Sequence, residues 1–298
     1  MTWLVIGGTG QLGKALSAVL GERGVDFRAW ASEDLDIRSS IRTNDLVKAL
    51  RPSVIVNAAA WTDVDGAEGK RLEAFAVNAY GPKNLASVAR ELGSVFVHIS
   101  TDYVFSGYSD SPWQESDTTG PLTVYGESKS LGEEFVKEIY PEKSFIIRTA
   151  WLYSEWGKNF AKTMTRLALL GNDEVKVVDD QVGQPTFAMD VAEQVVAAIE
   201  AQLPVGTYHA TNSGNASWFD FAQEIFSLCG DHTVVERVLR TDSASIIRAA
   251  KRPTYSVLGH DAWHSIGATG NSVAPMRDWK AALHEAMPAI ISAVKAEG

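Results

Sequence analysis

Two sets of residues in this sequence have the types and the spacing for proton transfer to a carbonyl oxygen. Tyr125 and Lys129 are four residues apart at the start of a segment, 126–139, with a helical pattern, and side chains at that spacing share one helix face. An ammonium beside a phenol favours the phenolate, so we expect the pKa of Tyr125 to lie below its usual value of about 10. Ser100 and Thr101 add hydroxyl groups at the predicted end of a strand. These groups together indicate a general acid.

A glycine-rich segment near the N-terminus indicates a phosphate site. Gly7-Gly8-Thr9-Gly10-Gln11-Leu12-Gly13 follows the apolar run 4–6 and opens the helical pattern 12–20. In such a strand–turn–helix context, glycines let backbone N–H groups approach a pyrophosphate at a helix N-terminus, which predicts dinucleotide binding. The end of the second predicted strand, residues 28–32, reads Arg-Ala-Trp-Ala-Ser and holds no acid. NADPH is therefore allowed as well as NADH.

The elements that must position these residues alternate over residues 1–150. Apolar runs predict strands at 4–6, 25–30, 54–56, 95–99 and 145–147. Helical patterns lie between them at 12–20, 41–50, 67–92 and 126–139, with a break expected near Gly81-Pro82. Repeated β-α units with continuous apolar strands predict an α/β fold, a Rossmann-type doubly wound parallel sheet with helices on both faces.

The pattern becomes less regular after residue 150. Helical candidates lie at 158–170, 188–202, 217–228 and 277–296, and strand candidates at 175–178, 205–209 and 234–238. We expect residues 1–150, with parts of 151–235, to form an NAD(P)-binding domain. Residues 151–298 should form mostly a smaller α/β substrate-binding lobe, with the chain crossing between the two.

The charge of the chain excludes some partners. A formal net charge of −10 over 298 residues argues against non-specific binding to nucleic acid or an anionic membrane. The sequence has no apolar run of about 18 residues and no charged-then-apolar leader, so we expect no membrane span and a cytoplasmic location. The single cysteine, Cys229, fits a reducing compartment.

One basic window opposes the overall acidity. Residues 237–252 hold Arg237, Arg240, Arg248, Lys251 and Arg252 against a single acid, Asp242. A solvated surface and a wall of a phosphate-binding pocket are both compatible with this window.

Longer segments extend the pattern into a family resemblance. The glycine turn, Thr101 and the Tyr125-x-x-x-Lys129 pair resemble the extended short-chain dehydrogenase/reductase superfamily. Over residues 2–260 the order and spacing of the segments closely resemble the dTDP-4-dehydrorhamnose reductase family. Those segments are NAAAWTDVD (57–65), STDYVF (100–105), PLTVYGESK (121–129), RTAWLY (148–153), GKNF (157–160), DQVGQPT (180–186) and RPTYS (252–256).

The resemblance implies reduction of the C4 ketone of a dTDP-4-dehydro-6-deoxy sugar, dTDP-4-dehydrorhamnose, with NADPH or NADH. By resemblance, Tyr125 donates the proton, Thr101 hydrogen-bonds the ketone oxygen, and Lys129 binds the nicotinamide ribose. The expected cofactor contacts, besides Tyr125 and Lys129, are Gly7, Gly10, Gln11, Leu12 and Gly13 at the pyrophosphate, Asp36 and Ile37 at the adenine, and Ala58, Ala59, Ala60 and Thr62 further along. The expected substrate contacts, besides Thr101, are Asp102, Tyr103 and Trp151 at the sugar and Arg252 at the diphosphate.

One departure from the family concerns metal and assembly. Some members dimerise through an acidic, magnesium-binding cluster, and in the corresponding stretches of this sequence only Asp190 is acidic. Because magnesium needs several hard oxygen ligands, we expect no metal and a monomer or a weak homodimer.

Two other functions share the resemblance. A catalytically idle NADP-binding regulatory subunit, like that of methionine adenosyltransferase, is disfavoured by the intact Thr101, Tyr125 and Lys129. Dehydratases of nucleotide sugars usually carry an Asp-Glu pair after the strand-end Thr, whereas Tyr103 follows Asp102 here. This difference disfavours a dehydratase or epimerase.

Overall fold

A computed structural model describes residues 2–230, 232–264 and 270–297. Its centre is a sheet of six parallel strands in the order β10-β5-β4-β3-β1-β2. The strands are β1 (Trp3–Ile6), β2 (Phe27–Trp30), β3 (Val54–Asn57), β4 (Val95–Thr101), β5 (Ser144–Thr149) and β10 (Gly206–His209). The order reverses between β1 and β3, and in open α/β sheets such a switch point opens a crevice at the carboxyl ends of the strands.

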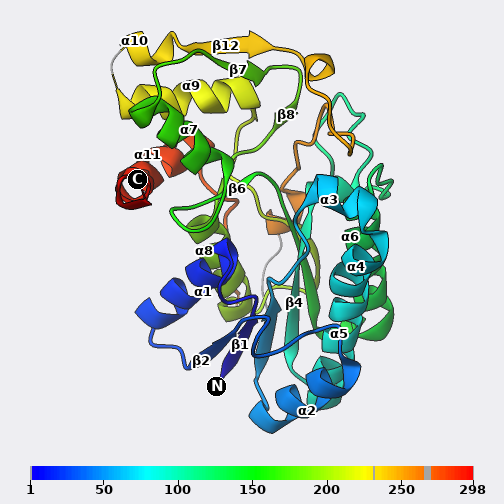
Figure 1. Cartoon of the computed structure of the whole chain (residues 1–298). Coiled ribbons are helices and arrows are strands. Elements are labelled where there is room, and N and C mark those ends of the chain that lie inside the picture. Colours follow the sequence, from blue (N-terminus) through cyan, green and yellow to red (C-terminus); the bar gives the residue numbers. More distant parts are fainter. Residues whose placement is uncertain (1, 231, 265–269, 298) are drawn as a thin grey trace.

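Helices cover both faces of this sheet, which confirms the doubly wound fold (Figure 1). Trp3 and Val5 face α1 (Gln11–Glu22) and α8 (Ala188–Glu200), whereas Leu4 and Ile6 belong to the core on the other face. That other face is covered by α2 (Ser40–Leu50), α5 (Gly81–Leu92) and α6 (Val124–Ile139). Both faces of β1 are thus buried, as its uninterrupted apolar sequence requires.

A separate core forms a smaller lobe beyond the carboxyl ends of the sheet (Figure 1). Its helices are α7 (Phe160–Leu170), α9 (Trp218–Cys229), α10 (His232–Val235) and α11 (Trp279–Glu297). Its strands form three pairs: β7 (Val175–Val178) with β12 (Val238–Thr241), β6 (Leu152–Tyr153) with β9 (Thr186–Phe187), and β8 (Val182–Gly183) with β11 (Ala216–Ser217). We call this part, with its connecting loops, the small lobe.

The chain returns from the small lobe to the sheet through α8 and β10. α8 packs against α1, and β10 pairs with β5 in parallel, Tyr208 opposite Ile147. Trp263 and Met276 also join the core beneath α1. The sixth strand of the sheet therefore comes from a segment that lies more than fifty residues after the fifth.

Two predicted elements differ from the structure. The strand expected at 234–238 is wrong, because α10 occupies Val234 and Val235 and the strand begins at Val238. The helical pattern 67–92 is divided into α3 (Val64–Gly69), α4 (Arg71–Phe75), a π-helical turn (Ala76–Tyr80) and α5. The irregularity precedes Gly81-Pro82 because proline fits the first turn of α5 without losing a hydrogen bond.

Candidate active site

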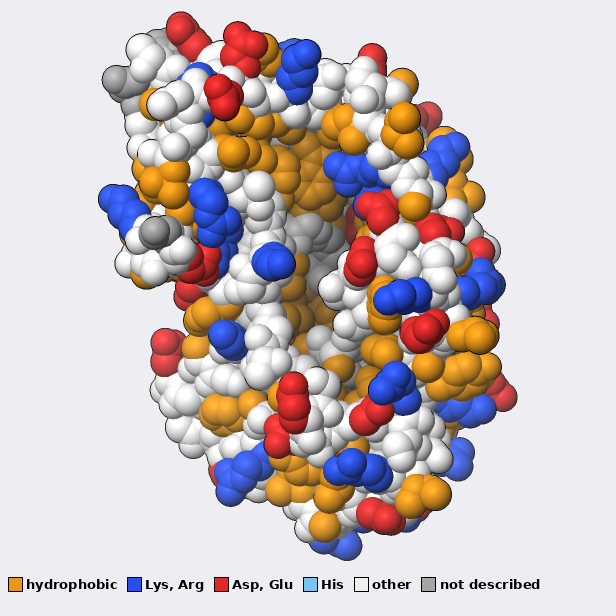
Figure 2. All heavy atoms as spheres, viewed as in Figure 1, with side chains coloured by type: hydrophobic (Ala, Val, Ile, Leu, Met, Phe, Trp, Pro, Cys, Tyr) orange, Lys and Arg blue, Asp and Glu red, His pale blue; other side chains and the backbone are white. Residues whose placement is uncertain are grey.

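A cavity of about 1250 Å³ lies between the carboxyl ends of the sheet and the small lobe. Figure 2 shows it as a hollow in the face of the molecule, with hydrophobic side chains inside and Lys and Arg side chains at its rim. With the exception of Gly13, every residue that we expected to contact cofactor or substrate lines this cavity. The expected residues thus converge on one place, although they come from segments as distant as Gly7 and Arg252.

The glycine turn forms one wall of the cavity. Gly7 has a left-handed φ of +82°, and a Cβ on it would lie 2.7 Å from the backbone nitrogen of Ala59. Gly10 is the N-cap of α1 and offers no side-chain cap to the first helical N–H groups. The turn is therefore a backbone cradle at a helix N-terminus, which fits the pyrophosphate of a dinucleotide.

Gly13, in the first turn of α1, packs against the backbone of Gly7. It does not line the cavity, and a Cβ on it would lie 2.1 Å from the carbonyl oxygen of Gly7. The missing side chain thus allows α1 to pack closely against the turn, while a contact of Gly13 with the pyrophosphate stays a prediction.

The part of the cavity beside Asp36 and Ile37 carries a cation, Arg38, that the sequence analysis did not single out. Arg38 donates from Nε to Asp36 Oδ1 (2.8 Å) and from Nη2 to Asp36 Oδ2 (2.8 Å), and both residues line the cavity. This hydrogen-bonded pair lowers the pKa of Asp36. The carboxylate of Asp34 is also occupied, because it accepts the N–H of Ala31 (2.8 Å).

Thr101 and Tyr125 meet at the carboxyl end of β4. Thr123 caps α6 by accepting the N–H of Gly126 (3.0 Å), which places Tyr125 in the first turn. Burial raises the pKa of Tyr125 to about 12, a hydrogen bond with Thr101 lowers it, and the carboxylate of Asp102 raises it. The lowered pKa expected for Tyr125 is therefore wrong, because removal of the phenol from water outweighs the neighbouring hydroxyl.

Lys129 faces the backbone of β4. Its Nζ donates to the carbonyl oxygen of Ile99 (2.5 Å), and its side chain is almost fully buried. Burial lowers the pKa of Lys129 to about 8, although Glu133 opposes this shift. The ammonium thus lies one helical turn below Tyr125 and can lose its proton near neutral pH.

A buried ion pair supports this face of α6. Glu133 accepts from Arg148 Nε (2.9 Å) and Nη2 (2.7 Å) and from the hydroxyl of Ser100 (2.6 Å). Arg148 is 1% exposed and also lies over the ring of Phe105. Tyr125, Lys129 and Glu133 follow one another at intervals of four residues, and this spacing was the signal that could have identified Glu133.

Asp102 is buried directly after Thr101, at the carboxyl end of β4. The hydroxyl of Thr101 donates to its Oδ1 (2.9 Å), whereas its buried Oδ2 receives no well-aligned hydrogen bond from the residues that the structure describes. Burial raises the pKa of Asp102 to about 6, and hydrogen bonds from Ser256 and Thr101 oppose this shift. A buried polar atom without a well-formed hydrogen bond beside two hydroxyl groups is typical of a site that a ligand completes.

Trp151 forms an aromatic wall with a residue that we had not predicted. Its ring stacks on that of Trp218 at 3.6 Å with an interplanar angle of 7°, and both line the cavity. Trp151 has a φ of +44°, a strained value for a bulky side chain. A Cβ on Gly183 would lie 2.5 Å from this ring, so the glycine leaves room for the stack. Strain of this kind clusters at ligand sites.

The basic window 237–252 divides into two parts. Arg237 donates to the carbonyl oxygens of Leu167 (2.8 Å) and Ala168 (3.2 Å) and so caps the end of α7. Of the five basic residues in this window, Arg248 and Arg252 line the cavity. Arg252 donates from Nη2 to Asp65 Oδ2 (2.6 Å), and its side chain is 13% exposed. Two of the five basic residues, rather than all five, are thus placed where they could contact a phosphate in the cavity.

The remaining acid of the family's metal cluster has protein partners. Asp190 accepts from Arg277 Nη2 (2.8 Å) and from Asn212 Nδ2 (2.7 Å). Within residues 2–230, 232–264 and 270–297, no group of three or more His, Cys, Asp or Glu side chains could hold a metal ion. No helix in these ranges is long and apolar enough to cross a membrane.

Comparison with known proteins identifies the family. Residues 1–291 match the family described as RmlD substrate binding domain. This chain belongs to the RmlD family. One RmlD relative, the dTDP-4-dehydrorhamnose reductase of Streptomyces griseus, is 44% identical over 97% of this chain and 93% of its own.

Two further comparisons bear on ligands. The dTDP-4-keto-6-deoxy-D-glucose reductase of Streptomyces niveus is 42% identical over 96% of both chains. The crystal structure of dTDP-4-dehydrorhamnose reductase from Bacillus anthracis, in complex with NADP, superposes with a TM-score of 0.88 at 36% identity, over 96% of this chain and 98% of that one. These relatives thus share almost the whole length of this chain.

Proposed function

We propose that this protein reduces the C4 ketone of dTDP-4-dehydrorhamnose to give dTDP-L-rhamnose, with NADPH as the hydride donor and NADH as a possible substitute. The observation that carries the proposal is the meeting of Thr101, Tyr125 and Lys129 in the cavity that the glycine turn also lines. Relatives of similar length named dTDP-4-dehydrorhamnose reductase support the substrate, and the NADP complex of one of them supports the cofactor.

In this proposal the lobe built on the six-stranded sheet, which we call the large lobe, holds the cofactor. The small lobe holds most of the nucleotide sugar. The nicotinamide supplies the hydride when the cofactor is bound. The turn at Gly7 and Gly10 holds the diphosphate of the cofactor, Ala58, Ala59, Ala60 and Thr62 border its path, and Arg38 provides a cation for a 2′-phosphate beside Asp36 and Ile37. Asp102, Tyr103 and Trp151 border the sugar, and Arg252 with Arg248 meets its diphosphate.

Proton transfer is assigned to Tyr125. A phenol with a pKa of about 12 is protonated at neutral pH, so it is ready to act as an acid. The alkoxide that hydride addition creates is more basic than a phenolate and takes this proton. Thr101 orients the ketone oxygen beside Tyr125, and the ammonium of Lys129 stabilises the phenolate that remains.

The test is turnover of NADPH and NADH with dTDP-4-dehydrorhamnose, compared with the same assay of Tyr125→Phe. We expect the wild type to consume cofactor only with the ketosugar present, and the variant to lose at least about a hundredfold in kcat. Tyr80→Phe is the matched control, because Tyr80 is exposed and does not line the cavity. Equal turnover by Tyr125→Phe, with its fold intact by circular dichroism, would refute the proton-donor role.

A second candidate substrate is dTDP-4-keto-6-deoxy-D-glucose, because the Streptomyces niveus reductase named for it is almost as similar as the reductase from Streptomyces griseus. Assaying both sugars separates the two by kcat/KM. We further propose that the protein acts in the cytoplasm as a monomer or a weak homodimer.

A further inference from the structure

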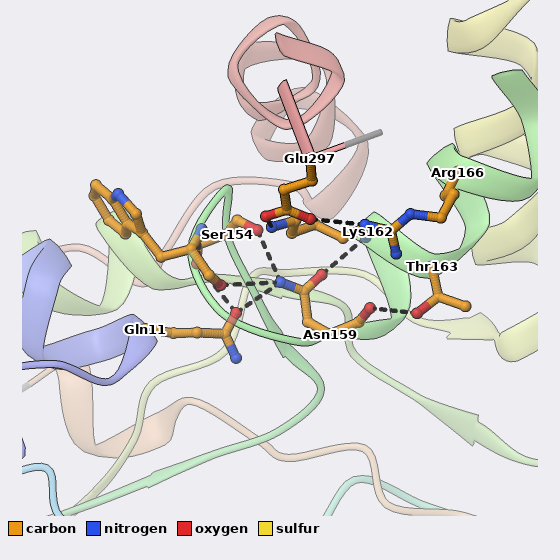
Figure 3. A network of polar contacts seen from close by, with 8 residues as sticks. Gln11, Ser154, Asn159, Lys162, Thr163, Arg166 and Glu297 are labelled. Atoms are coloured by element: carbon orange, nitrogen blue, oxygen red, sulfur yellow. Dashed lines mark hydrogen bonds and ion pairs between the residues drawn. The ribbon is translucent and has the colours of Figure 1, made fainter. Parts of the chain in front are cut away.

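A loop of the small lobe lies directly against the glycine turn. Gln11 Oε1 accepts hydrogen bonds from the Ser154 hydroxyl (3.0 Å) and from Asn159 Nδ2 (2.9 Å), as Figure 3 shows. Gly157, between them, has a φ of +66°, and a Cβ on it would lie 3.3 Å from Gln11 Cγ. The loop 154–159 therefore contacts the residue that follows the N-cap of α1.

Side chains on both sides hold this loop in place. Asn159 Nδ2 also donates to the carbonyl oxygen of Ser154 (2.8 Å), and Asn159 Oδ1 accepts the N–H of Lys162 (3.0 Å) as the N-cap of α7. Lys162 Nζ and Arg166 Nη2 then pair with Glu297 at 2.5 and 2.7 Å, which ties α7 to α11 (Figure 3). The position of the loop thus depends on the packing of two helices.

Lys158 lies between Gly157 and Asn159 in this loop. It lines the cavity and is exposed, and within the described residues no hydrogen bond or ion pair of it is found. Three other cations of the cavity have partners: Arg38 pairs with Asp36, Lys129 with the carbonyl oxygen of Ile99 and Arg252 with Asp65. Lys176 and Arg248 also line the cavity and are exposed, but they belong to segments other than the loop that contacts Gln11. The glycine turn itself, residues 7–13, contains no basic side chain.

We infer that Lys158 binds the diphosphate of the cofactor from the small lobe, opposite the backbone N–H groups of the glycine turn. This inference rests on the proposed function, because it assumes that a dinucleotide occupies the cradle. The helix N-terminus supplies partial charge on one side of the diphosphate and the ammonium supplies a full charge on the other. The cofactor site then spans both lobes, with Gln11 setting the distance between them.

The diphosphate of the nucleotide sugar has the same chemistry, and the geometry favours the cofactor. Of the two neighbours of Lys158, Asn159 donates a hydrogen bond to Gln11 of the glycine turn, and Gly157 lies so close that a Cβ on it would be 3.3 Å from Gln11 Cγ. Arg252 and Arg248 stand with Pro253 and Ser256, on a different segment of the wall. Two probes distinguish the two diphosphates: NADPH carries that of the cofactor, and dTDP carries that of the nucleotide sugar.

The experiment is calorimetric titration of wild type, Lys158→Ala, Lys158→Arg, Lys14→Ala and Arg252→Ala with NADPH alone and with dTDP alone. We expect Lys158→Ala to raise the Kd for NADPH by about tenfold without changing that for dTDP, and Lys158→Arg to restore most of the affinity. Lys14 is the matched control, since it is exposed and close to the turn in sequence but does not line the cavity. The Kd of Lys158→Ala should also depend less on salt.

An unchanged Kd for NADPH in Lys158→Ala would overturn the inference and leave the proposed function intact. A rise in the Kd for dTDP alone would overturn it as well, because it would assign Lys158 to the sugar nucleotide. If the wild-type protein binds no NADPH, the proposed function and this inference both fail. Arg252→Ala provides the opposite pattern, weaker dTDP binding, and shows that the titration resolves the two diphosphates.

Discussion

Tyr125, Thr101 and Lys129 illustrate how burial tunes single groups at this site. The same removal from water that raises the pKa of the phenol to about 12 lowers that of the ammonium to about 8. A general acid must hold its proton until the substrate arrives, and a cation must keep its charge while the phenolate forms. Burial therefore helps Tyr125 and limits Lys129.

The first prediction concerns pH. Because the pKa of Lys129 lies near 8, the charged form is lost as pH rises through this value, and kcat/KM for NADPH should fall above it. Measuring kcat/KM between pH 6 and 10 would locate this limb. In Lys129→Arg, whose guanidinium stays charged, the limb should move to higher pH while overall activity falls. A wild-type profile that is flat to pH 10 would contradict this view of Lys129.

A second prediction concerns the remote end of the substrate. Arg252→Ala should raise KM for the sugar nucleotide by about tenfold or more and change kcat little, because a non-reacting diphosphate contributes equally to ground and transition states. Arg240→Ala is the matched control: this arginine belongs to the same basic window but pairs with Asp179 and does not line the cavity. An unchanged KM in Arg252→Ala would mean that Arg252 does not bind the substrate and that its charge serves only the ion pair with Asp65.

At the scale of elements, the glycine turn depends on how closely α1 approaches β1. Gly13→Ala would bring a Cβ within 2.1 Å of the carbonyl oxygen of Gly7, and since both atoms are backbone-bound, the turn must move. We expect a loss of about 2 kcal/mol in the free energy of unfolding together with weaker NADPH binding. Urea denaturation and cofactor titration would measure both.

The same helix supplies the control. Gly21 lies in α1, and a Cβ on it would meet nothing within 4 Å. Gly21→Ala should therefore stabilise the protein by about 0.5–1 kcal/mol and leave cofactor affinity unchanged. Equal effects of the two substitutions would mean that helix propensity, and not packing against the turn, explains the result.

Elements also show what sequence patterns can and cannot predict. The run 175–178 is rich in valine and lies between Gly, Asn and Asp residues, and it forms β7 at those residues. The β-branched run around Val234 and Val235 also predicted a strand, but the register of β12 on β7 pairs Val238 with Val175 and leaves the earlier residues to α10. Short apolar runs do not reveal such pairing, because it depends on a partner far along the chain.

In the candidate site, too, local patterns were predictable from the sequence and contacts between distant segments were not. Residues within local motifs, such as those of the glycine turn and the Tyr125–Lys129 pair, were predictable because spacing along one element places them together. The stack of Trp151 on Trp218 and the pairing of Arg252 with Asp65 join segments that are far apart in sequence. These contacts depend on how the small lobe packs, and no pattern along the chain encodes that packing.

At the scale of the whole molecule, the loss of the acidic cluster predicts independence from metal. Asp190 is held by Arg277 and Asn212, so it is not free to share a magnesium ion with a second copy. Dialysis against EDTA should leave turnover unchanged, and added magnesium should not alter the mass measured by light scattering. Activity that is lost in EDTA and restored by magnesium would contradict this prediction.

The origin of β10 has a consequence for synthesis on the ribosome. The outer edge of β5 has no partner until residues 206–209 emerge, so this edge of the five-stranded sheet stays open while residues 150–205 are being made. An unpaired strand edge invites pairing with other chains. A nascent chain that stalls within residues 150–205 should therefore be prone to aggregation and a target for chaperones, although β4 and α6, which carry the predicted catalytic residues, are already present.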